Sequence, residues 1–207
     1  MSVQVVPSRS RSMLTRRPVA SESSPGASEA SVKIAGKLRG IKDSLLMTSA
    51  PLGVSSDVNR SAPLAEQLRN RNSELKRMIA IVAMHLDDAW RNMLLSSLDR
   101  LLDSDDWDDG FDVPDLQSFS TLLRAIVYLH PTKRPGVGLS QRGTFLSAWR
   151  QESDRLVLEY LPEDEIRWVI NRTIDGEKES GAGTSQIHRI PEVIAPYHPE
   201  PLFNDGI

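Results

Sequence analysis

The stretch TFLSAWRQESDRLVLEYLPEDEIRWVIN, residues 144–171, decides the fold because apolar and polar side chains alternate along three runs within it. Alternation with a period of two is typical of strands that bury one face. The runs cover residues 144–149, 155–161 and 166–171, and the segments between them have the length of hairpin loops. The sequence therefore predicts an antiparallel β-meander, with one face carrying Leu156, Leu158 and Tyr160 in one strand and Ile166, Trp168 and Ile170 in the next.

Two helices are expected to precede this meander and to cover it, since a sheet with one apolar face needs a cover. The first is expected at residues 64–95, where apolar side chains recur at heptad spacing, and the second between Pro114 and His130. A further short strand is expected at residues 136–139. The predicted fold class is α+β, with a long N-terminal helix and a second helix packed on a three- to four-stranded antiparallel meander, and with a disordered N-terminal arm.

The apolar stripe of the first helix has two interpretations. Its heptad positions are Leu68, Leu75, Val82 and Ala89, with Asn72, Ile79, Leu86 and Met93 displaced by four. A buried Asn pair can set the register of a helical dimer, so Asn72 is compatible with a homodimer or a partner seam through residues 64–95. The alternative is an amphipathic helix that covers the chain's own sheet, and this is favoured by the polar side chains beside or within the stripe, Arg71, Asn92 and Ser96.

The chain has 207 residues and a net charge of −3, but this charge is unevenly distributed. Residues 1–60 carry nine basic and four acidic residues, a net charge of +5, whereas residues 61–207 carry 16 basic and 24 acidic residues, a net charge of −8. Residues 1–30 are rich in Ser and poor in large apolar side chains, a composition typical of disorder. The expected organisation is a basic arm at residues 1–60, a helical and β-meander body at 61–172, and a loop with a proline-rich tail at 173–207.

Two parts make up the C-terminal region. Residues 173–186 are rich in Gly and Ser and are expected to form a loop. Residues 187–203 are more apolar, and we expect this tail to pack back on the body, or else to bind a partner as a peptide. Most of the tail is expected to be extended because of its prolines, Pro191, Pro196, Pro199 and Pro201.

Residues 31–47 form a short, basic and amphipathic segment of the arm, in which apolar side chains recur at helical spacing. Gly36 and Gly40 each cost a helix about 1 kcal/mol relative to Ala, so the segment is a poor helix unless it is docked. It either folds on binding a partner or packs on the chain's own body. The candidate partner-binding residues here are Ile34, Lys37, Leu38, Ile41 and Lys42.

A second candidate is an acidic segment, residues 99–115, which carries eight aspartates. A calcium-binding EF-hand needs oxygen ligands at fixed positions, but counting from Asp105 places Trp107 at the third position and Leu116 at the twelfth. The segment is therefore either a solvated loop or an acidic interface with aromatic anchors. Its candidate partner-binding residues are Asp105, Asp106, Trp107, Asp109 and Phe111.

The sequence offers little material for catalysis. It contains no cysteine, and its four histidines do not show the spacing of metal ligands. It has no nucleophile elbow, no phosphate-binding loop and no dinucleotide-binding glycine motif. We therefore expect neither an enzyme nor a protein that carries a metal or a cofactor.

Nucleic-acid binding is the alternative to protein binding. Basic residues of the arm could neutralise phosphates, and neighbouring strands carry a mix of aromatic and basic groups used for stacking on bases, Trp149, Arg150, Arg167 and Trp168. The acidic body argues against this interpretation. A cytoplasmic location and no membrane association are expected, because no apolar run approaches the ~18 residues of a membrane-spanning helix and a chain without cysteine fits a reducing compartment. The composition of residues 1–21 is also that of a transit peptide.

One part of the chain resembles a known group of proteins. The segment PGVGLSQRGTFLSAW at residues 135–149, followed by RLVLEY at 155–160 and IRW at 166–168, is similar to small bacterial proteins of unassigned function. The resemblance covers about 40 residues and implies genes that accompany toxin–antitoxin or mobile modules. The leading hypothesis is a non-enzymatic, antitoxin-like or immunity-like protein that binds a toxin or effector through its arm and acidic segment. The alternative is a nucleic-acid-associated regulatory protein that uses the basic arm.

Overall fold

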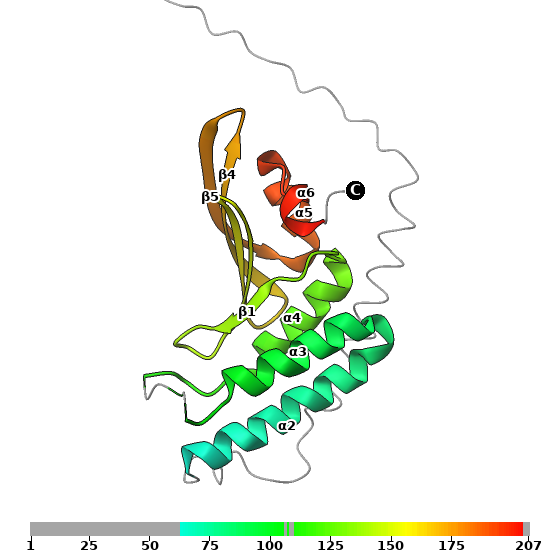
Figure 1. Cartoon of the computed structure of the whole chain (residues 1–207), viewed down its shortest axis with the longest axis vertical. Coiled ribbons are helices and arrows are strands. Elements are labelled where there is room, and N and C mark those ends of the chain that lie inside the picture. Colours follow the sequence, from blue (N-terminus) through cyan, green and yellow to red (C-terminus); the bar gives the residue numbers. More distant parts are fainter. Residues whose placement is uncertain (1–62, 106, 108–109, 205–207) are drawn as a thin grey trace, which may run out of the picture.

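The structure, a computed structural model, describes residues 63–105, 107 and 110–204 (Figure 1). Its helices are α2 (Leu64–Val82), α3 (Asp88–Leu101), α4 (Leu116–Leu129), α5 (Ile190–Ile194) and α6 (Glu200–Phe203). Its strands are β1 (Gly136–Leu139), β2 (Phe145–Gln151), β3 (Asp154–Tyr160), β4 (Glu165–Ile174) and β5 (Glu177–Gln186). Short 3-10 turns lie at Ala83–His85, Ile187–Arg189 and Ala195–Tyr197.

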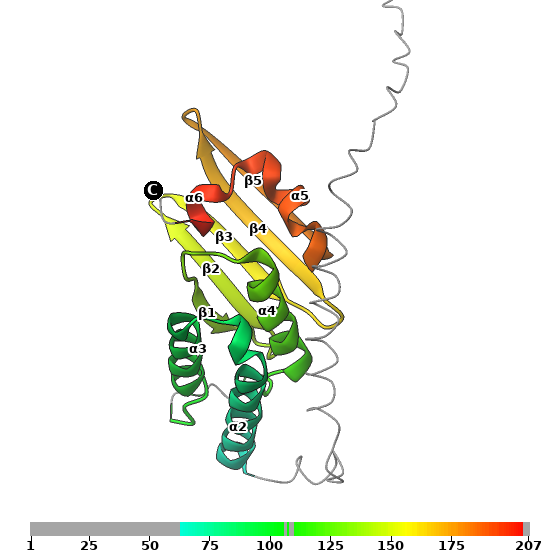
Figure 2. The ribbon, with the colours of Figure 1, turned by 90° about the vertical axis from the view of Figure 1, so that its right-hand side faces the viewer.

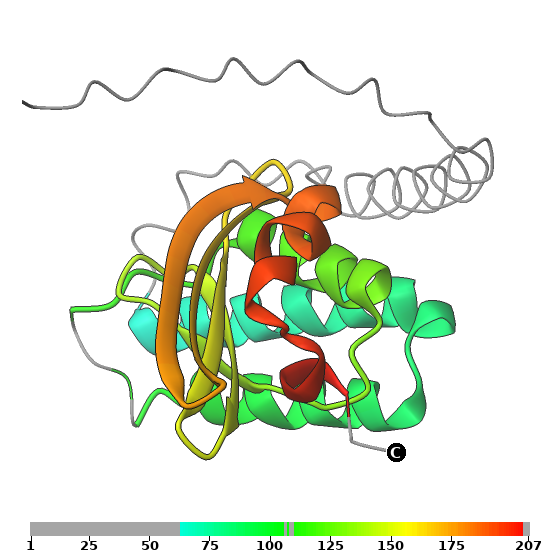
Figure 3. The same cartoon turned by 90° about the horizontal axis from the view of Figure 1, so that it is seen from above.

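The strands form one sheet in the order β1-β2-β3-β4-β5, and each strand is antiparallel to its neighbours. Figure 2 shows the strands side by side with α4 across them, and Figure 3 shows α4, α5 and α6 on one side of the sheet. The α+β class is therefore confirmed. The side chains predicted to share the buried face do so, Leu156, Leu158, Tyr160, Ile166, Trp168 and Ile170.

The prediction of three to four strands is wrong, because residues 177–186, expected to form a loop, form β5. Asp175 and Gly176 have positive φ angles of 52° and 84°. Two consecutive residues with positive φ are typical of the two-residue turn that suits a β-hairpin. β4 therefore continues to Ile174, and the chain folds straight back along it.

The polar and small composition of β5 follows from its position at the edge of the sheet. On the helix-facing side, a Cβ atom at Gly181 would lie 2.2 Å from the hydroxyl of Tyr197, and one at Gly183 would lie 3.0 Å from the ring of Trp168. These two glycines leave room for the aromatic rings, whose centroids are 6.1 Å apart. The glycines that suggested a loop are thus required by packing.

The prediction of one helix over residues 64–95 is also wrong, because the chain turns between α2 and α3. Asp87 is extended, and its carboxylate accepts a hydrogen bond of 2.6 Å from the backbone N–H of Trp90. A side-chain oxygen in this position is the ordinary cap of a helix N-terminus, so α3 starts anew at Asp88. The heptad pattern continues across this turn because α2 and α3 each bury an apolar stripe at helical spacing.

α2 and α3 pack side by side as a helical hairpin (Figure 1). Asn72 donates a hydrogen bond of 3.0 Å to Asp99, and Lys76 donates to the same carboxylate. The hydrogen bonds from Lys76 and then from Asn72 hold the pKa of Asp99 below its ordinary value of 3.8. Five members of the apolar stripe pack within the chain, since they are buried, Leu68, Leu75, Ile79, Val82 and Leu86.

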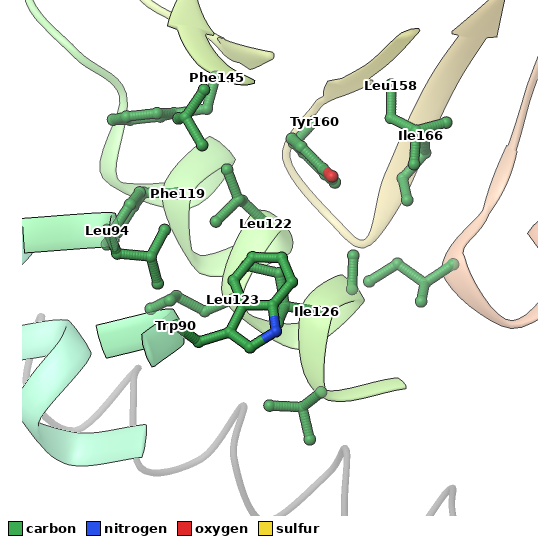
Figure 4. Close-up of a cluster of buried hydrophobic side chains, with 14 of the residues drawn as sticks. Trp90, Leu94, Phe119, Leu122, Leu123, Ile126, Phe145, Leu158, Tyr160 and Ile166 are labelled. Carbon is green, nitrogen blue, oxygen red and sulfur yellow. The ribbon is translucent and has the colours of Figure 1, made fainter. Parts of the chain in front are cut away.

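α4 is the centre of the core (Figure 4). It is the predicted second helix, and it ends where His130 adopts a left-handed conformation before Pro131. The ring of Phe119 lies 4.8 Å from that of Phe145, centroid to centroid. The buried side chains around α4 come from that helix, from α3 and from the sheet, Trp90, Leu94, Leu122, Leu123, Ile126, Leu158, Tyr160 and Ile166.

A buried hydroxyl connects α4 to the sheet. Ser118 donates a hydrogen bond of 2.6 Å to the carbonyl of Tyr160 and accepts one of 2.8 Å from the backbone N–H of Phe145. These two backbone groups lie at the ends of β3 and β2, where they are removed from water. Ser118 therefore fixes the position of the helix on the strands as well as satisfying both groups.

The C-terminal tail packs back on the body, as predicted, but it is not mostly extended. It forms α5, α6 and two 3-10 turns, because Pro191, Pro196 and Pro201 occupy first-turn positions, where a proline favours a helix start. The tail buries four apolar side chains, Ile187, Ile190, Ile194 and Leu202.

Candidate functional site

The predicted partner-binding residues fall in two places. Those of the arm, Ile34, Lys37, Leu38, Ile41 and Lys42, lie outside the described residues, as do Asp106 and Asp109 of the acidic segment. Asp105 is exposed, and the structure brings Trp107 and Phe111 together with ring centroids 6.3 Å apart in an edge-on arrangement. Trp107 is half-buried and packs against the core. It anchors the acidic segment to the body.

The acidic segment is connected to the turn between β1 and β2. The backbone N–H of Asp112 donates to the carbonyl of Gln141 over 2.8 Å, and that of Asp115 donates to the carbonyl of Gly143 over 2.9 Å. This turn and the turn between β3 and β4 lie at the same end of the antiparallel sheet. The acidic segment therefore borders one end of the sheet.

The face of the sheet opposite α4, α5 and α6 has no described helix packed across its strands (Figure 3). We call it the open sheet face and define it by the outward residues of β2 to β5. None of these residues is fully buried, whereas those that alternate with them in β2 and β3 pack mostly into the core. They are Leu146, Ala148, Arg150, Arg155, Val157, Glu159, Arg167, Val169, Asn171, Thr173, Lys178, Ser180, Ala182 and Thr184.

An apolar row crosses the middle of the open sheet face. Ala148 is opposite Val157, Val157 is opposite Val169, and Val169 is opposite Ala182. Val169 is 42% exposed. A single exposed valine is ordinary on a protein surface, but these four aligned apolar side chains make a continuous strip across four strands.

One side of the apolar row is polar and internally paired. Arg167 donates a hydrogen bond of 2.7 Å to Glu159, which also accepts one of 2.7 Å from the hydroxyl of Thr144. The Thr144 hydroxyl lies 2.6 Å from that of Ser140. The charge of Arg167 is therefore matched within the chain.

The other side of the row is basic and unmatched. Arg150 and Arg155 lie directly opposite each other on β2 and β3, and both are exposed. Neither forms an ion pair with a residue in the part of the chain that the structure describes. Lys178 adds a third cation at the same end of the sheet, beside the turn between β4 and β5. These three cations form the basic end of the open sheet face, opposite the end that the acidic segment borders, although Glu152, Asp175, Glu177 and Glu179 adjoin it in the turns and at the start of β5.

The mix of aromatic and basic groups expected for base stacking is divided between the two faces of the sheet. Trp149 is 2% exposed and Trp168 is 7% exposed, and both lie on the helix-facing side. Arg150 and Arg167, one position away in each strand, lie on the open sheet face. The tryptophans are core residues, so the open sheet face lacks their rings.

The open sheet face was not predicted as a site from the sequence, although a signal for it exists. The runs Leu156-Val157-Leu158 and Trp168-Val169-Ile170 are continuously apolar, so their middle residues depart from strict alternation. In a strand that is buried on one side only, the middle residue of such an apolar run lies on the solvent side. The alignment of these positions across strands depends on the register and is visible only in the structure.

Two features are absent from the described part of the chain, a cluster of metal ligands and a membrane-spanning helix. Residues 63–105, 107 and 110–204 contain no group of three or more His, Asp or Glu side chains placed to hold a metal ion. No helix among them is both long enough and apolar enough to span a membrane.

Comparison with known proteins finds no matching family model, no matching curated protein and no matching solved structure.

Proposed function

We propose that the chain is a non-enzymatic protein-binding module and that the open sheet face is its docking surface. The supporting observation is the apolar row of Ala148, Val157, Val169 and Ala182, which is flanked by charged and polar side chains. Protein interfaces combine an apolar centre with a polar rim. The apolar row corresponds to the centre of such an interface, and the polar and charged side chains at the two ends of the face correspond to its rim.

The finer part of the proposal is an antitoxin-like or immunity-like role in the cytoplasm, in which the chain binds and blocks a toxin or effector. It is supported by the sequence resemblance between residues 135 and 168. The segment at 31–47 and the acidic segment would then make additional contacts with the same partner. The alternative, a nucleic-acid-associated regulator, is supported by the net charge of +5 on residues 1–60.

Replacing Val169 by Glu is expected to weaken partner binding by about tenfold or more, because a carboxylate in the centre of an interface must lose its hydration. The partner is first recovered from the native host with the full-length chain, and its dissociation constant is then measured for each variant. The same partner measured with a chain lacking residues 1–47 gives the separate contribution of the arm.

Met84→Glu is the matched control for this experiment. Met84 is 85% exposed and lies on the 3-10 turn after α2, away from the open sheet face. The control removes exposed apolar surface and adds the same charge, and its affinity is expected to equal that of the wild type. Equal weakening by the two substitutions would contradict the proposal.

A further inference from the structure

We infer that the partner of the open sheet face is a protein that presents carboxylates to Arg150 and Arg155, next to small apolar side chains that meet the apolar row. This inference rests on the proposed protein-binding function and specifies the chemistry and the orientation of the partner.

Arg150 and Arg155 form an unmatched pair of like charges on the open sheet face. Directly opposite residues of an antiparallel pair have Cβ atoms about 5 Å apart, and like charges in this arrangement destabilise a sheet. The next residues across the sheet from Arg155 are Asn171 and Ser180, which are neutral. Of the acids in the adjoining turn, Asp154 is paired with Arg172 over 3.1 Å, and Glu152 forms no ion pair with either arginine.

Another pair of opposite residues on the same face differs from these arginines in being matched. Glu159 and Arg167 lie directly opposite each other and form an ion pair, so this face can accommodate a matched pair. At Arg150 and Arg155 the complementary charge has to come from outside the described chain. Guanidinium groups bind carboxylates through two parallel hydrogen bonds, and two neighbouring guanidinium groups suit two carboxylates.

The charged segments of the chain itself are poorly placed to supply carboxylates at the basic end. The acidic segment of the same chain borders the opposite end of the sheet, where its backbone is hydrogen-bonded to Gln141 and Gly143. The segment at 31–47 is basic and would be repelled by the arginines. An acidic partner therefore fits the basic end better than either charged segment of the chain itself.

A protein also fits this face better than a nucleic acid. Phosphates would match the arginines, but the aromatic side chains that could stack on bases, Trp149 and Trp168, are buried on the other side of the sheet. The apolar row would then remain without a complementary surface. Small apolar side chains beside carboxylates match both the row and the basic end.

The two ends of the face also fix the orientation of the partner. Its acidic part lies at the end formed by the turns after β2 and β4, beside Arg150, Arg155 and Lys178. The reverse orientation would leave Arg150 and Arg155 without partner carboxylates and would place those carboxylates at the end that the acidic segment borders.

The inference is tested on the full-length chain by NMR, with a synthetic amphipathic peptide of Glu, Ala and Leu as the probe. We expect this peptide to shift the methyl signals of Val157 and Val169 and the guanidinium signals of Arg150 and Arg155. The same peptide with Lys in place of Glu is expected to shift none of them. The Arg150→Gln/Arg155→Gln variant is expected to bind the Glu peptide at least about tenfold more weakly.

The unfolding midpoint of the double variant distinguishes a binding role of the two arginines from a structural role. Because it removes a like-charge pair, its unfolding midpoint is expected to equal or exceed that of the wild type. The matched control is Arg77→Gln/Arg100→Gln, which removes the same charge from exposed positions on α2 and α3. This control is expected to bind the Glu peptide as the wild type does.

Four results would overturn the inference. They are no shift at the named residues with the Glu peptide, equal weakening by the control variant, tighter binding of a single-stranded DNA of the same charge to the same residues, or self-association of the chain through these residues in sedimentation. If a natural partner is lost with Val169→Glu while the Glu peptide does not bind, the proposed function stands and the charge inference fails.

Discussion

Replacing Asp164 by Asn is expected to lower the free energy of unfolding by about 3 kcal/mol, because it leaves a buried arginine without its counter-ion. Arg124 on α4 is 4% exposed. It donates hydrogen bonds to Asp164 in the turn between β3 and β4, to Ser120, and over 3.4 Å to Thr121. Asp164 is the carboxylate among these partners, so its charge compensates the guanidinium.

The choice of Asn isolates the effect of charge in this variant. Asp164 has a φ of 66°, and Asn tolerates this left-handed conformation as well as Asp does. The matched control is Glu163→Gln, because Glu163 is exposed and has a φ of 61°. Chemical denaturation is expected to show a change within about 0.5 kcal/mol for the control. Similar midpoints for both variants would contradict the role of Asp164.

Replacing Gly143 by Ala is expected to lower the free energy of unfolding by about 2–4 kcal/mol, for two independent reasons. Gly143 has a φ of 71°, which an L side chain rarely adopts. A Cβ atom there would lie 2.5 Å from the carbonyl oxygen of Val113, a backbone atom that cannot rotate away. The substitution would push the acidic segment away from the turn between β1 and β2.

Gly138→Ala is the control for this variant. Gly138 lies in the neighbouring strand β1, and a Cβ atom added there would have no heavy atom within 4 Å. Its stability is expected to stay within about 1 kcal/mol of the wild type. Thermal unfolding of the two variants gives the comparison, and hydrogen exchange at Asp112 and Asp115 reports whether the acidic segment has separated. A wild-type midpoint for Gly143→Ala would contradict the argument.

The parts of the fold that could be predicted from the sequence are those in which one local pattern decides the structure. The strands β2, β3 and β4 alternate with a period of two, and α4 buries a stripe with a helical period and stops before Pro131. In these elements, intrinsic pattern and tertiary packing favour the same conformation.

The errors occurred where tertiary packing decides the local structure. The glycines of β5 are in a strand because Tyr197 and Trp168 need the space, which no local pattern reveals. The heptad pattern over residues 64–95 predicted a single helix. In the sequence, nothing distinguishes Asp87 from its neighbour Asp88 as a helix cap, and only the structure shows that the Asp87 side chain caps α3. Composition therefore failed to predict the strand β5, and periodicity failed to predict the break between α2 and α3.

The candidate site was predictable only in part, for a related reason. Each position of the apolar row is visible in the sequence, but its alignment requires the register of four strands at once. The same holds for Arg150 and Arg155, which are five positions apart in the sequence and opposite each other in the sheet. The charge asymmetry of the arm and the acidic segment, in contrast, can be counted in the sequence without a structure.

The most direct test of the central claim, that the open sheet face is a protein-docking surface, is photo-crosslinking in the native host. A photoreactive phenylalanine analogue replaces Val169 in the full-length chain, and the same analogue at Met84 is the control. We predict a discrete adduct with one partner from position 169 and no such adduct from position 84. Absence of an adduct from position 169, or the same adduct from both positions, would contradict the claim.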